Sequence, residues 1–67
     1  MLYAAEVIWS EPIPGSDGKK RRLSSDVQGY STFDEAKKCI DEYEKWCNRN
    51  GFVMKTGKIY KIEEDLS

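Results

Sequence analysis

The sequence predicts a single small α+β domain over residues 1–67, with the element order strand, strand, helix, strand, strand. Three observations predict it: an alternating apolar stretch at the N-terminus, a segment of helical periodicity in the middle, and a second alternating stretch after it. One amphipathic helix covers one apolar face of a sheet. We therefore expect a mainly antiparallel four-stranded sheet with the helix packed on one face and the other face open to solvent.

Residues 2–9 predict the first strand, because alternate side chains in this stretch are apolar. One face is wholly apolar and is assigned to the core: Tyr3, Ala5, Val7 and Trp9. Two prolines and two glycines predict a connection over residues 10–18, since they favour turns and interrupt sheet ladders. Residues 19–28 predict the second strand, and its low apolar content indicates the edge of a sheet.

Residues from about 32 to 50 predict the helix, which is the best defined element of the sequence. Thr32 and Glu35 fit a capping box at its start. Apolar residues then recur in steps of three and four, which places them on one stripe: Phe33, Ala36, Ile40, Tyr43 and Cys47. The pair Asn50-Gly51 predicts the end of the helix.

The segments "FVMK" and "KIYKIEE" flank Thr56-Gly57, which predicts a tight hairpin and therefore a third and a fourth strand. Both faces of these strands carry apolar side chains, since Tyr60 and Ile62 alternate with Ile59 and Lys61, so we expect the face away from the helix to hold Leu2, Ile8 and part of this second hairpin. Such a face is a docking surface for another protein, or it is covered by the C-terminal tail or by a second copy. The sequence leaves both interpretations open.

The residue types speak against an enzyme. Histidine, the commonest general base and metal ligand, is absent, and the five glycines are scattered rather than gathered in a phosphate loop. Cys39 and Cys47 are eight residues apart on the predicted helix, about 12 Å, which is too far for a disulfide or a shared zinc ion. We expect buried, reduced thiols, no catalytic residues, no cofactor and no metal.

The chain also lacks a run of roughly 20 apolar residues that would span a membrane. Its N-terminal stretch carries Glu6, which is unlike a signal peptide. We expect a cytoplasmic protein, working in the host cytoplasm if it is encoded by a phage.

The stretch "SDGKKRRLSS" holds four consecutive cations: Lys19, Lys20, Arg21 and Arg22. As a nucleic-acid contact they would bind phosphates, and Tyr30 would add an exposed ring. As a structural feature they form the solvated part of a hairpin. Eleven cationic and twelve anionic side chains give a net charge of −1, whereas dedicated nucleic-acid binders are usually basic.

A second pattern surrounds this run. Gly18-Lys19-Lys20-Arg21 forms a basic turn, and Gly29-Tyr30, Thr32 and Glu35-Ala36 follow it at the start of the helix. In this pattern residues 15–46 resemble the arm-type DNA-binding domain of phage and transposon tyrosine integrases. The resemblance implies a helix behind a three-stranded sheet that enters the DNA major groove. The chain departs from the family in its acid-rich helix and its additional hairpin.

In size, composition and charge the chain also resembles the small α+β proteins that phages make to inhibit host enzymes, such as anti-CRISPR proteins. Three hypotheses follow. The first is a non-catalytic inhibitor or adaptor that docks on a protein of the nucleic-acid or defence machinery, through Asp34, Asp41, Glu42 and Tyr60. The second is a DNA-binding accessory protein that uses Lys19–Arg22 and the sheet. The third is a homodimeric structural protein.

Overall fold

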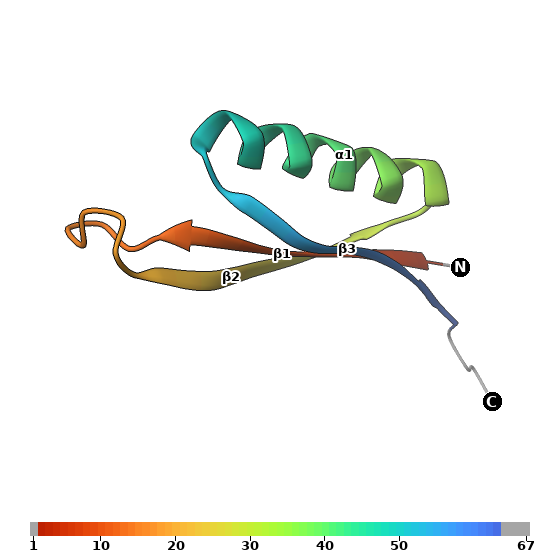
Figure 1. The fold of residues 1–67 in the computed structure, drawn as a ribbon. Coiled ribbons are helices and arrows are strands. Elements are labelled where there is room, and N and C mark those ends of the chain that lie inside the picture. Colours follow the sequence, from red (N-terminus) through yellow and green to blue (C-terminus); the bar gives the residue numbers. More distant parts are fainter. Residues whose placement is uncertain (1, 64–67) are drawn as a thin grey trace.

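The computed structural model describes residues 2–63 and has two layers, one helix and one sheet (Figure 1). Three strands form the sheet: β1 (Leu2–Pro12), β2 (Arg21–Tyr30) and β3 (Val53–Ile62). Their order is β2-β1-β3, and both neighbours run antiparallel to the central strand β1. The helix α1 (Phe33–Asn50) lies on one face, and the α+β class is therefore confirmed.

The prediction of four strands is wrong, because residues 53–62 form one continuous strand rather than a hairpin. Gly57 lies inside β3 opposite Val7, and a Cβ added to it would stand 2.8 Å from Cγ2 of Ile40 on the helix. Glycine is favoured here because the helix packs so closely, and not because the chain turns. The order is strand, strand, helix, strand.

The first two strands form a long hairpin that extends further than predicted. β1 continues to Pro12, which stands at the strand end opposite Arg21. The connection then covers residues 13–20, where the Ser16 hydroxyl donates a hydrogen bond to the Ile13 carbonyl (2.6 Å). Backbone torsions in this connection are left-handed at Gly15, Asp17 and Gly18. As predicted, β2 is an edge strand.

The helix begins and ends where the sequence indicates. Thr32 is the N-cap residue, and its side-chain oxygen accepts a hydrogen bond from the backbone N–H of Glu35 (3.2 Å). Gly51 ends the helix in the left-handed region with φ of 71°. Thr32 as the N-cap residue and Gly51 as the end of the helix are thereby confirmed.

The core lies between α1 and β1 and consists of two clusters. One contains Ala5, Ala36 and Cys39, and the other contains Val7, Trp9 and Cys47. The predicted core face of the first strand is thereby confirmed, with Tyr3 half-buried at its end. Both cysteines are free and buried, also as predicted, and burial raises the pKa of the Cys47 thiol.

Trp9 anchors the second cluster. Its ring stacks on Tyr43 at a centroid distance of 5.7 Å and meets the edge of Trp46 at 5.3 Å. Such aromatic pairs stabilise a fold by more than the apolar area that they bury.

Among residues 2–63, no helix is both long enough and apolar enough to cross a membrane.

Candidate binding surfaces

The face of the sheet opposite the helix, called the open face below, is built from alternate residues of all three strands. Pairing in the sheet arranges them in rows across it. The central row is Val27, Glu6 and Lys58. Towards one end follow Gly29, Ala4, Tyr60, Leu2 and Ile62. Towards the other end follow Ser25, Ile8, Thr56, Leu23, Ser10 and Val53.

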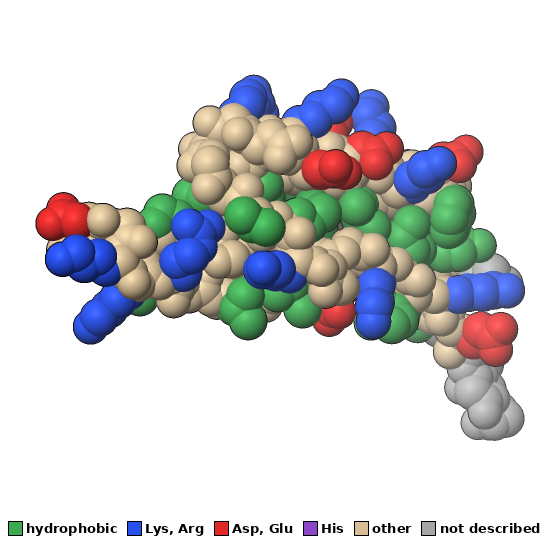
Figure 2. Space-filling model, in the orientation of Figure 1, with side chains coloured by type: hydrophobic (Ala, Val, Ile, Leu, Met, Phe, Trp, Pro, Cys, Tyr) green, Lys and Arg blue, Asp and Glu red, His purple; other side chains and the backbone are tan. Residues whose placement is uncertain are grey.

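Most of the exposed large hydrophobic side chains of the described residues gather on the open face. Of the seven large hydrophobic side chains that are exposed among residues 2–63, six belong to it: Leu2, Leu23, Val27, Val53, Tyr60 and Ile62. Leu23 is 68% exposed. Figure 2 shows hydrophobic side chains below the sheet as well as in the layer between sheet and helix. An exposed apolar surface of this extent is typical of an interaction site.

Leu2, Tyr60 and Ile62, which the sequence offered as candidates for a solvent-facing sheet surface, lie on the open face and are exposed. A polar pair divides this surface: Glu6 lies opposite Lys58, and the Tyr60 hydroxyl donates a hydrogen bond to Glu6 Oε1 (3.3 Å). The open face therefore has two apolar ends and a charged middle.

The four predicted phosphate contacts split into two pairs. Arg21 Nε donates to Ser10 Oγ (2.8 Å), and Arg22 Nε donates to Glu11 Oε1 (3.0 Å). Lys19 and Lys20 are exposed in the connection before β2. The two arginines thus join β2 to β1, in agreement with the structural interpretation of the run.

Glu11 is the anion that holds this part of the hairpin. The Ser24 hydroxyl donates to Glu11 Oε1 (2.6 Å), and this bond, followed by the one from Arg22, lowers the pKa of Glu11. Because Glu11 of β1 accepts hydrogen bonds from two residues of β2, it favours one register of the hairpin.

The predicted protein-binding residues do not meet on one surface. Asp34, Asp41 and Glu42 are exposed on the helix, whereas Tyr60 lies on the open face at the other side of the molecule. A flat partner can contact either set but not both. Tyr30, predicted as an exposed ring, is half-buried beside the helix.

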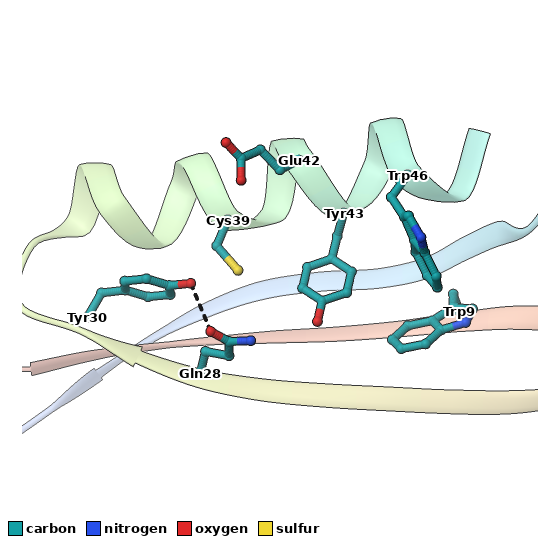
Figure 3. Close-up of a pocket in the computed structure, with 7 residues that line it drawn as sticks. All are labelled: Trp9, Gln28, Tyr30, Cys39, Glu42, Tyr43 and Trp46. Carbon is teal, nitrogen blue, oxygen red and sulfur yellow. Dashed lines mark hydrogen bonds between the residues drawn. The ribbon is translucent and has the colours of Figure 1, made fainter. Parts of the chain in front are cut away.

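A groove that the sequence analysis missed lies between α1 and β2 (Figure 3). It arises because the helix packs mainly over β1 and β3 and leaves the helix side of β2 less covered. Its volume is about 480 Å³. Aromatic rings line much of it: Trp9, Tyr30, Tyr43 and Trp46. The other lining residues are Gln28, Cys39 and Glu42.

A chain of hydrogen bonds runs along the β2 side of the groove. The Tyr30 hydroxyl donates to Gln28 Oε1 (3.2 Å), and Gln28 Nε2 donates to Asp26 Oδ2 (3.0 Å). The Tyr43 hydroxyl donates to the same oxygen of Asp26. This bond raises the pKa of Tyr43 to about 12 and, with the bond from Gln28, lowers that of Asp26.

We predict that Tyr43→Phe makes stability less sensitive to acid. Folding lowers the pKa of Asp26, so its bond to Tyr43 stabilises the fold above the unfolded pKa of about 4 and is lost as pH falls through the folded pKa. The phenol has a raised pKa, so its contribution is present below about 10 and is lost as pH rises through about 12. Urea unfolding near neutral pH and near pH 3 measures the acid side.

The double variant Tyr43→Phe, Asp26→Asn is the control for this prediction. It is compared with the single variant Asp26→Asn. Once Asp26 is uncharged, removing the Tyr43 hydroxyl should no longer change the difference in stability between the two pH values. If Asp26 is intact and the acid dependence of stability is the same in the wild type and in Tyr43→Phe, the assignment of the Tyr43–Asp26 bond is contradicted.

Within residues 2–63, no group of three or more Cys, Asp or Glu side chains is placed to hold a metal ion. No family model, curated protein or solved structure matches this chain. The features of the described residues that bear on function are the open face, the hairpin and the groove.

Proposed function

We propose that this chain is a non-catalytic binding module that docks on another protein through the open face. The observation that supports the proposal is the gathering of six exposed apolar side chains on that face. Each apolar face of a sheet is normally buried against another layer of the structure, and α1 supplies this layer for one face only. Docking on a partner supplies the missing layer. The partner class predicted from the sequence, a protein of the nucleic-acid or defence machinery, stays a prediction.

The size and charge of the open face favour a separate protein over a second copy. Three strands about 4.8 Å apart and about 10 residues long make a face of roughly 500 Å². A stable specific interface buries roughly 800 Å² on each partner, so two flat copies would fall short. Glu6 and Lys58 also occupy the centre, where permanent homodimers are mostly apolar. A partner that also contacts an edge strand supplies the remaining area.

A pair of variants tests the proposal by affinity capture from the natural host. Val27→Asp places a charge in the central row at an exposed position, and Asp34→Lys reverses a charge on the helix. We expect a protein that is captured in stoichiometric amount by the wild type and by Asp34→Lys, and that is lost with Val27→Asp. Capture that depends on Asp34 and not on Val27 contradicts docking through the open face.

Two measurements accompany the capture. Circular dichroism and urea unfolding should show that Val27→Asp folds like the wild type, because the side chain is 59% exposed. Sedimentation velocity over a wide concentration range should show a monomer. A wild-type dimer that Val27→Asp dissociates would identify a second copy as the occupant and overturn the choice of a separate protein.

DNA binding is the second candidate, and one observation favours it: a helix behind a three-stranded sheet, which the integrase resemblance implies. Our proposal predicts instead that the protein does not bind duplex DNA. Within the basic run, Arg22 is paired with Glu11, and Arg21 is held against β1 by its bonds to Ser10, which restricts the reach of both side chains to phosphates. Fluorescence anisotropy with a labelled duplex at about 50 and 200 mM salt measures this.

Binding that weakens steeply with salt and disappears in the double variant Lys19→Ala, Lys20→Ala would establish the DNA-binding candidate. Lys37→Ala, Lys38→Ala removes the same charge from the helix and is the matched control. Weak retention that both double variants reduce equally would reflect net charge alone and would leave the proposal intact.

A further inference from the structure

We infer that the groove between α1 and β2 is a binding site for the guanidinium group of an arginine side chain. The groove lies on the helix side of the sheet, so this site is separate from the open face and does not depend on the proposed docking. Three properties support the inference: aromatic surface, negative charge and size.

The aromatic surface suits a flat cation. Figure 3 shows Tyr30 and Tyr43 on either side of Cys39 and Gln28, with Trp46 one helical turn beyond Tyr43. Tyr30, Tyr43 and Trp46 are each only partly buried, so part of each ring borders the groove. A guanidinium is planar and weakly hydrated, and it stacks on aromatic faces more readily than an ammonium does.

The charge of the groove is negative. Glu42 is the one charged residue among the seven that line it, and Asp26 adjoins it through the Gln28 and Tyr43 bonds. The Cys39 thiol, burial and the carboxylates of Glu42 and Asp26 together raise the pKa of Tyr30 to about 12. Of these influences, the carboxylates of Glu42 and Asp26 are the ones that favour a cation in the groove.

The volume of the groove is large enough for an amino-acid side chain. Sites for small molecules commonly enclose about 300–1,000 Å³, and the groove holds about 480 Å³. Glu42 carries an exposed carboxylate at the helix side, and a carboxylate accepts two parallel hydrogen bonds from a guanidinium. Gln28 and Asp26 already bond to each other on the strand side, which fixes the opposite wall.

N-acetyl-arginine amide is the probe, and N-acetyl-citrulline amide is its uncharged counterpart of nearly the same shape. Trp9 and Trp46 are the two tryptophans of the sequence and both line the groove, so their fluorescence reports binding directly. We expect saturable binding of the arginine compound in the millimolar range. The citrulline compound should bind at least tenfold more weakly, because it offers neither charge nor the full set of donors.

Variants of residues that line or adjoin the groove test whether the arginine compound binds there. Glu42→Gln should weaken binding of the arginine compound about fivefold, which is typical of losing one partly exposed ion pair. Asp41→Asn removes the same charge from the adjacent helix position, which is exposed and does not line the groove, and should leave affinity unchanged. Tyr30→Phe keeps the ring and should bind like the wild type, whereas Tyr30→Leu should bind several-fold more weakly.

Three results would overturn the inference. They are equal affinity for the arginine and citrulline compounds, equal losses in Glu42→Gln and Asp41→Asn, and no saturable change up to about 50 mM probe, well beyond the expected millimolar affinity. Nuclear magnetic resonance provides a second readout, since amide shifts should concentrate at Gln28, Tyr30 and Cys39. Shifts that concentrate on the open face would place the probe elsewhere and would also count against the groove.

Discussion

Gly57→Ala is expected to destabilise the protein by about 2 kcal/mol, although alanine favours an extended strand more than glycine does. The new Cβ would lie 2.8 Å from Ile40 Cγ2, which is closer than carbon atoms approach without strain. Ile40 is branched at Cβ and partly buried on the helix, so it cannot turn aside freely. Urea unfolding followed by circular dichroism measures the change in the free energy of unfolding.

Gly29→Ala is the matched control. Gly29 is also in a strand, and a Cβ there would meet no atom within 4 Å, so we expect a change near zero or a slight gain. Ile40→Ala gives a further check, because Ile40 Cβ would stand 3.9 Å from the added atom. In the double variant with Ile40→Ala, Gly57→Ala should cost much less. Equal losses at Gly29 and Gly57 would contradict the close packing.

Gly57 also shows why the strand count was not predictable from the sequence. Glycine serves a hairpin turn through its left-handed torsions, and it serves close packing through its missing side chain. The pair Thr56-Gly57 is compatible with both. The choice depends on where Ile40 stands after the helix has folded onto the sheet, which is a tertiary contact between residues 17 apart.

Local features, by contrast, were predictable. Thr32 and Gly51 bound the helix through hydrogen bonds to residues three or four positions away, so the sequence pattern contains all the interacting groups. The same holds for the core face of β1, because alternation in a strand follows from backbone geometry. These predictions needed no knowledge of the neighbouring elements.

Predicting the groove, by contrast, required knowledge of how the neighbouring elements pack. Its signal in the sequence is weak: Ser24, Asp26 and Gln28 are polar residues on the side of β2 that faces the helix, while Val27 and Leu23 face away. Polar residues on the helix side indicate that α1 does not cover this strand fully. Recognising them needs the register between β1 and β2, which the sequence does not determine by itself.

Trp9→Ala is expected to have the largest effect on stability, a loss of about 3–5 kcal/mol. Trp9 is 8% exposed, stacks on Tyr43 and meets Trp46, and it belongs to one of only two core clusters in the described chain. A domain of this length has a free energy of unfolding of about 3–10 kcal/mol, so the variant should lose a large part of its stability and unfold at a much lower temperature than the wild type. Circular dichroism and thermal unfolding measure the loss.

Trp9→Phe keeps the argument testable if Trp9→Ala does not fold at all. Phenylalanine retains a ring against Tyr43 and leaves a smaller cavity, so we expect a loss of about 1–2 kcal/mol and a cooperative transition. Leu23→Ala is the control, because it removes an apolar side chain of the open face that is 68% exposed, and it should change stability by less than about 0.5 kcal/mol. A greater loss at Leu23 than in Trp9→Phe would mean that the open face is buried in solution. The protein would then be an oligomer, and the open face would be part of its folded core.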